Sequence, residues 1–398
     1  MVAPVIPRQA RSQSARRVCL VSGGTGGHLM PALVLGRSLL QSGEQPLLVT
    51  EGRDVERELV RRELPEIEAV EVPRSGGTAA ALPWWLARAT AKARRLLRRH
   101  DIGGVVSTGG RASVPVALAA KSLGVPVFLL EQNAVTGRAN RWLQRLAHRM
   151  YTGLPNGEQQ AERVLHTGTP LRQGFGHVDQ AEARRSLGLG SDAPVVLVTG
   201  GSQGARALNE LVPQALQRVR RKVQVVHLSG LGNDAEVRLR YAQAGREVAA
   251  HVRPVAADMD RLFAAADLVV CRGGGTTVSE LMAVGRAAVV VPYPHHKDQQ
   301  QLHNARVLER VGAAVICEEH DSDVERFAER LGGLLSEPAR LRAMGDEARK
   351  LRRMDAVETI LADVQEQVEA ASPSRRWQSG ADRSAVEPRG PRRRGGVA

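Results

Sequence analysis

The chain has 398 residues, of which 42% are hydrophobic and 25% are charged, a composition typical of a globular protein with room for two domains. Its formal net charge of +14 favours an anionic partner such as nucleic acid, a phospholipid surface or a phosphorylated substrate. No run of about 18 apolar residues occurs, which argues against a membrane-spanning helix. Cys19, Cys271 and Cys317 lie in apolar runs, which predicts reduced core thiols in a cytoplasmic protein rather than a disulfide scaffold.

The excess positive charge is concentrated at the two ends of the chain. Residues 1–17 carry four arginines and no acid, and residues 372–398 are rich in Arg, Pro, Gly and Ser. Both segments are predicted to be disordered basic extensions, because they hold too little apolar side chain to offset the entropy of folding. The apolar run 18–21 is too short for the core of a signal peptide. A nucleic-acid partner is not expected, since only 3% of the residues are aromatic and no recognition motif is present.

Short apolar runs alternate with longer amphipathic runs along most of the chain. In the first half, strands are predicted at 18–21, 46–50, 69–72, 104–107 and 126–130, and helices at 31–41, 54–63, 83–99 and 113–123. Residues 151–185, rich in Gly and Pro, are expected to be irregular. In the second half, strands are predicted at 194–199, 223–228, 268–271, 287–291 and 313–317, and helices at 205–221, 234–245, 259–266, 277–284 and 299–311.

This order predicts an α/β protein made of two Rossmann-like, doubly wound parallel-sheet domains. We expect an N-terminal domain over 18–167 and a C-terminal domain over 168–371, with the linker near 167–174. The last helix could return to pack on the N-terminal domain. Ligands of such sheets bind beyond the carboxyl ends of the strands. The two domains are therefore expected to face one another across a central cleft.

Three glycine-rich loops each follow a predicted strand and precede a predicted helix: SGGTGG at 22–27, GGSQGA at 200–205 and RGGGTT at 272–277. Such loops let the backbone approach a ligand closely, and the helix that follows directs free N–H groups at it, so anions suit the position. None is a phosphate loop of the Gly-Lys-Ser/Thr type. The alternatives are tight turns without a ligand or, because Glu51 ends the second strand, an NAD-binding fingerprint.

Polar residues accompany the third glycine loop. Glu280 is expected in the first turn of the helix, either to accept hydrogen bonds from two ribose hydroxyls or to complement the helix dipole. A second polar segment, PYPHHKDQQQ at 292–301, follows the next strand and belongs to the same sheet edge. Amide side chains such as those of Gln300 and Gln301 pair well with sugar hydroxyls, because they both donate and accept.

Six blocks occur in this order: GGTGGH, LLEQNAVTGRAN, TGTPLR, VTGGSQGARALN, CRGGGTTVSE and HHKDQQQLHNA. Together they resemble the MurG family, the peripheral GlcNAc transferases of peptidoglycan synthesis, which have the GT-B fold and belong to glycosyltransferase family 28. The resemblance covers roughly residues 18–350. It implies a hexosyltransferase that moves GlcNAc from UDP-GlcNAc to the C4 hydroxyl of MurNAc in lipid I (undecaprenyl-pyrophosphoryl-MurNAc-pentapeptide), with inversion, to give lipid II.

The resemblance also implies the site residues. Ser202 matches the phosphate contact, Glu280 the carboxylate on the ribose and Arg172 an arginine beside the nucleotide, while Gln301, Asn133 and the additional contact Gln300 reach the sugar. The full set implied for UDP-GlcNAc is Thr25, Gly26, Gly27, Asn133, Arg172, Ser202, Ala256, Gly275, Thr276, Thr277, Val278, Ser279, Glu280 and Gln301. The loop 25–28 is also expected to border the acceptor diphosphate.

Inverting transfer needs a base for the acceptor hydroxyl and charge stabilisation for the UDP leaving group. His28 is the preferred candidate for the base, and Glu131, at the end of a strand on the same edge, is the other. The alternative for His28 is a hydrogen-bond donor to the acceptor phosphate, and the alternative for Glu131 is a carboxylate that orients His28 or Asn133. Glycine-loop N–H groups can stabilise UDP, so no obligatory metal or cofactor is expected. The Asp-x-Asp pairs at 258–260 and 321–323 are read as helix caps.

A lipid acceptor requires contact with a membrane. Trp84 and Trp85 open a predicted helix that continues into the basic residues Lys92, Arg94, Arg95, Arg98 and Arg99, and indoles beside basic side chains suit an anionic lipid surface. The alternative is a core helix with a solvated basic face. The expected place is the cytoplasmic face of the bacterial cell membrane, with other cell-wall synthesis proteins as further partners.

Another GT-B lipid glycosyltransferase and a sugar-nucleotide epimerase remain the alternative functions.

Overall fold

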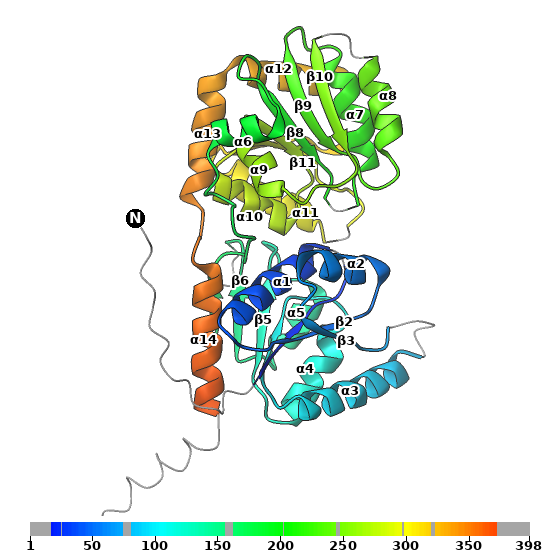
Figure 1. The fold of residues 1–398 in the computed structure, drawn as a ribbon, viewed down its shortest axis with the longest axis vertical. Coiled ribbons are helices and arrows are strands. Elements are labelled where there is room, and N and C mark those ends of the chain that lie inside the picture. The colour runs from blue at the N-terminus through cyan, green and yellow to red at the C-terminus, as the bar shows by residue number, and fades with distance from the viewer. Residues whose placement is uncertain are drawn as a thin grey trace, which may run out of the picture.

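The computed structural model describes residues 17–24, 26–74, 81–155, 162–201, 203–243, 247–296, 298–319 and 323–371. Two α/β domains lie one above the other (Figure 1). The predicted terminal extensions lie outside the described residues, apart from Arg17, which is the first residue of the first strand rather than the last of an extension. Thr25 and Ser202, two of the implied ligand contacts, also lie outside.

The N-terminal domain is built on a seven-stranded parallel sheet in the order β3-β2-β1-β4-β5-β6-β7. Its strands are β1 (Arg17–Val21), β2 (Leu47–Thr50), β3 (Glu68–Glu71), β4 (Ile102–Ser107), β5 (Val127–Glu131), β6 (Arg149–Thr152) and β7 (Val164–His166). Its helices are α1 (Gly26–Gln41), α2 (Asp54–Glu63), α3 (Leu82–Arg99), α4 (Ser113–Ser122) and α5 (Arg138–Leu143). The central strands are almost continuously apolar because helices cover both faces of the sheet.

The C-terminal domain repeats the design with a six-stranded parallel sheet in the order β10-β9-β8-β11-β12-β13. Its strands are β8 (Val195–Thr199), β9 (Val223–Leu228), β10 (Val248–Arg253), β11 (Leu268–Cys271), β12 (Ala287–Val290) and β13 (Ala314–Ile316). Its helices are α6 (Gln180–Leu187), α7 (Arg206–Leu216), α8 (Asp234–Ala242), α9 (Met259–Ala265), α10 (Gly275–Val284), α11 (Gln300–Glu309), α12 (Val324–Ser336) and α13 (Pro338–Lys350). The predicted fold class of two Rossmann-like domains is confirmed.

The last helix, α14 (Ala356–Ala371), packs on the N-terminal domain although it follows the C-terminal one (Figure 1). Its Ile360, Val364 and Val368 are buried with the residues of β1, β4 and α1. A hydrogen bond from the Tyr151 hydroxyl to Asp363 (2.7 Å) adds a polar contact to this packing. The chain therefore crosses between the domains twice, once before α6 and once after α13, and the second crossing ties the end of the chain to the first domain.

Residues 151–185 are more regular than their glycine and proline content predicts. They contain the end of β6, all of β7 and most of α6. The two strands are only three or four residues long, too short for a clear periodicity. Helix α6 does carry sequence signals: Asp179 caps it by accepting from the Glu182 N–H (3.0 Å), and Gly188 ends it at φ 69°, as expected for a helix of this kind.

The described helices include none whose length and apolar content would let it cross a bilayer. Helix α3 shows why a long helix can still fail this condition. Ala89, Ala93 and Leu97, at a spacing of four residues, form its buried stripe, while its opposite face is strongly basic. This is the pattern of a helix that lies on a core rather than in a membrane.

Candidate active site

The carboxyl ends of the strands in both sheets point toward the boundary between the domains. From the N-terminal domain, the loops after β1 and β5 reach this boundary; from the C-terminal domain, those after β11 and β12 do so. In parallel α/β sheets this edge is where ligands bind. The structure thus brings together the first glycine loop, the third glycine loop and the polar segments that follow β5 and β12.

The two domains are in contact at the start of α10. The Thr276 hydroxyl donates a hydrogen bond to the Gly27 carbonyl (3.1 Å). Gly275 lies so close to the other domain that a Cβ there would stand 2.3 Å from the Gln132 carbonyl oxygen, so only glycine fits without a shift. The residue before α10, Gly274, has no side chain to cap the helix, and the first N–H groups and positive dipole end of α10 lie at the domain boundary, which suits an anionic ligand.

Asn304 on α11 fastens the domains together a short distance away. Its side-chain oxygen accepts from the Ala134 N–H (2.8 Å), and its NH2 group donates to Asn133 Oδ1 (3.0 Å) and to the Gly273 carbonyl (2.9 Å). The side chain is fully buried. One amide therefore joins the loop after β5, the third glycine loop and α11, and Asn133, an implied sugar contact, is held by it.

Glu131 ends β5 and is held by four donors. Its Oε1 accepts from the N–H and the side-chain amide of Asn133 (3.1 and 2.9 Å), and its Oε2 accepts from the Gly137 N–H and the Asn140 amide (2.8 and 3.0 Å). The carboxylate is 2% exposed. Because both oxygens are already engaged, this geometry favours a group that shapes the loop after β5 rather than one that accepts a proton from a substrate.

His28 lies in the first turn of α1, against the loop after β4. A Cβ at Gly109 would stand 2.7 Å from the imidazole Cδ2, so the ring packs directly on that backbone. Within the described residues, Nδ1 has no hydrogen-bond partner. Burial lowers the pKa of His28, and the charge of Glu131 opposes this only in part. The imidazole is consequently neutral at physiological pH, with a nitrogen able to accept a proton.

Glu280 lies in the second turn of α10, not in the first, because the helix begins at Gly275. The reading of this residue as a partner of the helix dipole is therefore weakened, since that effect is confined to the first turn. The residue is 8% exposed. Burial raises the pKa of its carboxyl to about 7, against the opposing charge of Arg172. A buried carboxylate that is this costly to ionise is typical of a functional site.

Arg172 belongs to the first interdomain crossing and contacts both domains. Its guanidinium donates to the Ala257 carbonyl (3.2 Å) and lies 3.7 Å from Glu63 Oε1 at the end of α2. Beside it, the Thr169 and Ser279 hydroxyls are 2.9 Å apart. The half-buried Ala256 precedes the carbonyl that Arg172 holds. The crossing segment is thus fixed to α10 and to the loop after β10.

The helix that carries the amide side chains of Gln300 and Gln301, α11, is preceded by an unusual backbone conformation. Gln299, the residue before the helix, has φ 45°, a left-handed conformation that is uncommon outside glycine and often found at functional sites. Gln301 Oε1 accepts from the Tyr293 N–H (2.9 Å). A Cβ at Gly137 would stand 3.6 Å from the Gln300 amide nitrogen, so Gln300 faces the N-terminal domain.

The two Asp-x-Asp pairs have separate roles. Asp258 precedes α9 but makes no capping bond; its carboxylate pairs with Arg253 (3.2 Å), so its reading as a cap is wrong. Asp323 does cap α12 through the Glu325 N–H, while Asp321 lies outside the described residues. In the described ranges, no group of three or more His, Cys, Asp or Glu residues forms a metal cluster.

The two tryptophans of α3 differ in their surroundings. Trp84 is 68% exposed, whereas Trp85 is half-buried and donates from its indole to the Pro73 carbonyl (2.8 Å). Leu82, at the start of the helix, is also exposed, and α3 lies on the side of the N-terminal domain away from the C-terminal domain (Figure 1). The expected pairing of Trp84 and Trp85 on one exposed face is not seen.

Sequence reasoning missed three residues at this boundary: Asn304, Asn140 and Arg272. Asn304 follows Gln300 and Gln301 by four and three residues, a helical spacing that puts all three on one face, so this signal was available. Arg272 pairs with Glu319 (2.6 Å) and donates to the carbonyls of Val291 and Pro292. It joins the ends of three strands, a contact that sequence spacing does not reveal.

Comparison with known proteins gives the family. Residues 18–152 match the glycosyltransferase family 28 N-terminal domain, and residues 195–360 match the family 28 C-terminal domain. The chain belongs to glycosyltransferase family 28. The family's two domain models therefore meet at the boundary described above, and the predicted membership of the MurG group is confirmed by the curated relatives.

Among these family 28 relatives, the UDP-N-acetylglucosamine–N-acetylmuramyl-(pentapeptide) pyrophosphoryl-undecaprenol N-acetylglucosamine transferases of Sorangium cellulosum and Halorhodospira halophila are 37% and 39% identical. The match to the first relative covers 88% of this chain and 88% of that protein. The match to the second covers 87% of this chain and 97% of that protein. The crystal structure of MurG from Acinetobacter baumannii has a TM-score of 0.75 at 29% identity, covering 88% of this chain and 99% of that one. The GT-B fold is thereby confirmed.

Proposed function

We propose that this protein transfers GlcNAc from UDP-GlcNAc to the C4 hydroxyl of MurNAc in lipid I, with inversion, to form lipid II. The relatives named above, which match along nearly the whole chain, are GlcNAc transferases of this kind. The observation that carries the proposal is the meeting of His28, Asn133 and the uncapped N-terminus of α10 at one domain boundary. A base and an anion site at one place are what glycosyl transfer from a nucleotide sugar needs.

The donor would be held by the C-terminal domain. The free N–H groups at the start of α10 would bind the diphosphate and stabilise the negative charge that grows on UDP as the sugar leaves. Arg172 adds a cation on the same side, and the Glu280 carboxylate would accept from the two ribose hydroxyls. Gln300, Gln301 and Asn133 offer amides to the sugar from both domains, so that closure of the domains would orient the anomeric carbon.

The acceptor would enter from the N-terminal domain. His28 would take the proton of the C4 hydroxyl as that oxygen attacks the anomeric carbon from the face opposite UDP, which gives inversion. Glu131 would act by holding Asn133 and the loop after β5, because its oxygens are occupied by four donors. Helix N–H groups and Arg172 supply the positive charge that UDP requires, so we propose a reaction without an obligatory metal.

The lipid chain of the acceptor requires membrane contact, and we propose that α3 provides it from the cytoplasmic side. Trp84 and Leu82 are exposed at its start, and Arg88, Lys92 and Arg95 are exposed along it. Each basic residue near an anionic surface contributes about 1 kcal/mol. Other cell-wall synthesis proteins remain proposed partners.

Release of UDP from UDP-GlcNAc, with and without a lipid I analogue, tests this function. We expect release that depends on the acceptor and persists in the presence of EDTA. A sugar-nucleotide epimerase would instead process the donor without any acceptor, and release that needs added divalent metal would contradict the proposed metal-independent reaction.

A further inference from the structure

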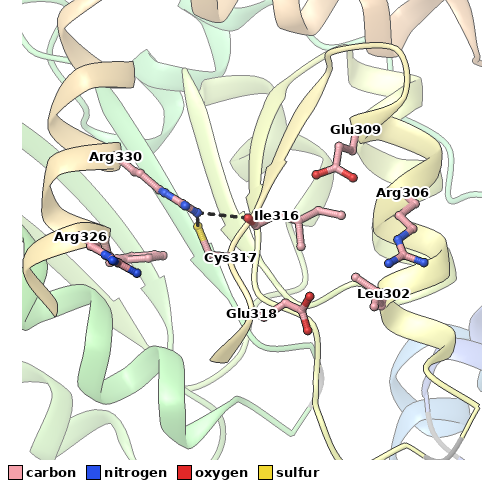
Figure 2. Close-up of a pocket in the computed structure, with 9 residues that line it drawn as sticks. Leu302, Arg306, Glu309, Ile316, Cys317, Glu318, Arg326 and Arg330 are labelled. Carbon is pink, nitrogen blue, oxygen red and sulfur yellow. Dashed lines mark hydrogen bonds between the residues drawn. The ribbon is translucent and has the colours of Figure 1, made fainter. Parts of the chain in front are cut away.

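A cavity lies at the edge of the C-terminal sheet, where β13 ends. It has a volume of about 440 Å³ and opens between α11 and α12, over the edge strand β13 (Figure 2). Ile316 and Cys317 form its floor, and Leu302 adds an apolar wall. Its size falls in the range of small-molecule sites, and nothing in the proposed reaction uses it.

Three guanidinium groups line this cavity: Arg306 from α11, and Arg326 and Arg330 from α12. Arg330 donates to the Ile316 carbonyl (3.3 Å) and to Cys317 Sγ (3.2 Å) (Figure 2). Among the ion pairs that join described residues, none links one of these three arginines to a carboxylate, although the charge of Arg326 helps to lower the pKa of Asp323. Within the described residues, the cavity therefore gathers three guanidinium groups that make no direct ion pair with a carboxylate.

This lack of pairing is unusual for the surface around it. On the same helix α12, Glu325 pairs with Arg218 (2.8 Å), and at the start of α13 Glu337 pairs with Arg340 (3.3 Å). Arg326 and Arg330 are one helical turn apart, a spacing at which like charges repel and destabilise the helix by a few tenths of a kcal/mol. An anion between them would relieve this repulsion.

Two carboxylates also line the cavity, and they restrict what can bind. Glu309 at the end of α11 and Glu318 after β13 lie across the cavity from Arg326 (Figure 2). A bare polyanion would meet them unfavourably. A molecule with an acidic group at one end and hydroxyl or ammonium donors at the other would match both sides of the cavity.

We propose that this cavity binds a small organic anion, whose carboxylate or phosphate group lies against Arg326 and Arg330 and whose donor groups face Glu309 and Glu318. Guanidinium groups bind both kinds of oxyanion through paired, charge-assisted hydrogen bonds. The apolar floor at Ile316 would contact the carbon skeleton between the two ends.

The position of the cavity connects it to the candidate donor site. Helix α11 begins with Gln300 and Gln301 and continues directly into Leu302 and, one turn later, Arg306, both of which line the cavity. Glu318 is followed by Glu319, whose carboxylate holds Arg272 in the third glycine loop (2.6 Å). A ligand that moves α11 or this ion pair would change the affinity for UDP, and the cavity would then act as an effector site. This second step, unlike the binding itself, rests on the proposed function.

Titration calorimetry on the full chain tests the binding, with glucose 6-phosphate and citrate as phosphate and carboxylate probes and inorganic phosphate as the bare anion. We expect saturable binding of at least one organic probe, tighter than that of inorganic phosphate. Arg326→Gln with Arg330→Gln should weaken it by about tenfold or more, since two charged hydrogen-bonding groups are lost. The matched control, Arg61→Gln with Arg340→Gln, removes two exposed arginines elsewhere and should leave binding unchanged.

Absence of binding by every organic probe, or equal loss in the control variant, would overturn the site. The coupling is measured separately as the Kd for UDP with and without the bound probe, and we expect a shift that disappears in the Arg326→Gln/Arg330→Gln variant. An unchanged Kd for UDP would overturn the coupling. Failure of UDP to bind at all would count against the proposed function and leave the calorimetric result on the anion intact.

Discussion

Two ionisable residues at the domain boundary have environments that favour different roles. His28 keeps an unpartnered ring nitrogen within the described structure and a lowered pKa, whereas Glu131 is saturated with donors. The sequence favoured His28 as the base but kept Glu131 as the alternative, because position at a strand end does not reveal how many donors a carboxylate binds. The hydrogen bonds of these two residues favour His28 as the general base.

Replacing His28 with Ala should lower kcat by roughly two to four orders of magnitude, the usual contribution of a general base. Because burial lowers the pKa of His28 from 6.5, the wild-type rate should fall only when the pH drops below that value. Steady-state kinetics from pH 5 to 8 would check both effects. A variant that retains the acidic limb of the wild-type profile would assign the base elsewhere.

Glu131→Gln should act mainly on stability and loop geometry. The Gln NH2 group would replace an oxygen that accepts from Gly137 and Asn140 or from Asn133, so donors would face donors. The loss of hydrogen bonds to a charged group costs about 1.5–3 kcal/mol each. We expect a lower Tm and an unchanged pH profile for residual activity. A wild-type Tm combined with loss of the acidic limb would instead make Glu131 the base.

Glu280 gives a stability signature that depends on pH. Its pKa is raised from 4.5 to about 7 by burial, so the folded state favours the protonated form. That stabilisation is complete below pH 4.5 and is lost as the pH rises through 7, by about 3 kcal/mol in total. Relative to Glu280→Gln, the wild type should lose stability between pH 5 and pH 8 in urea unfolding. A difference that does not change with pH would place the carboxyl in a solvated environment.

At the scale of single elements, sequence periodicity was reliable for most strands with an apolar run and weak where polar residues interrupt that run. Strands such as β4 and β11 were predicted from their apolar runs, but β6, β7 and β10 were missed. Residues 248–253 of β10 alternate between buried and exposed positions and include His251 and Arg253, which dilutes the apolar signal. Contacts between elements, such as Arg272 with Glu319, depend on folding and have no local pattern.

Helix α3 allows the membrane proposal to be tested with two matched tryptophans. Trp84→Ser removes an exposed indole, so it should reduce binding to anionic vesicles while Tm stays near the wild-type value. Trp85→Ser removes the hydrogen bond to Pro73 and half-buried packing, so it should lower Tm. Vesicle co-sedimentation and thermal melts would separate the two, in a chain ending at residue 371 to remove the basic tail.

If vesicle binding were the same with and without the Trp84 indole, α3 would not be the membrane face. Neutral vesicles serve as the control for charge, since electrostatic attraction to the exposed arginines of α3 requires anionic lipid and weakens with salt.

At the scale of the whole molecule, function depends on holding the two domains in a fixed position relative to each other. Asn304, Thr276 and Arg172 each contact both sides of the boundary, and α14 returns the end of the chain to the first domain. The sequence predicted the two domains and their opposed edges from alternating runs. It could not predict these interdomain bonds, because they join residues as far apart as Ala134 and Asn304.

Asn304→Ala should therefore affect both domains at once. The Ala134 N–H and the Gly273 carbonyl would lose their partner, and an unsatisfied buried polar group costs about 1–3 kcal/mol. We expect a lower Tm together with a reduced kcat, and Asn304→Gln should not restore either because its longer side chain displaces the amide. Loss of kcat at an unchanged Tm would limit Asn304 to substrate contact.

The central claim is that both domains act on one transfer reaction. In this reaction GlcNAc moves to the acceptor sugar with inversion of configuration at its anomeric carbon. The most direct measurement is the structure of the product formed from UDP-GlcNAc and a water-soluble lipid I analogue, by mass spectrometry and NMR. The account predicts one added GlcNAc, joined to the C4 oxygen of MurNAc by a β linkage. An α linkage, attachment at another hydroxyl, or conversion of UDP-GlcNAc without any sugar on the acceptor would contradict it.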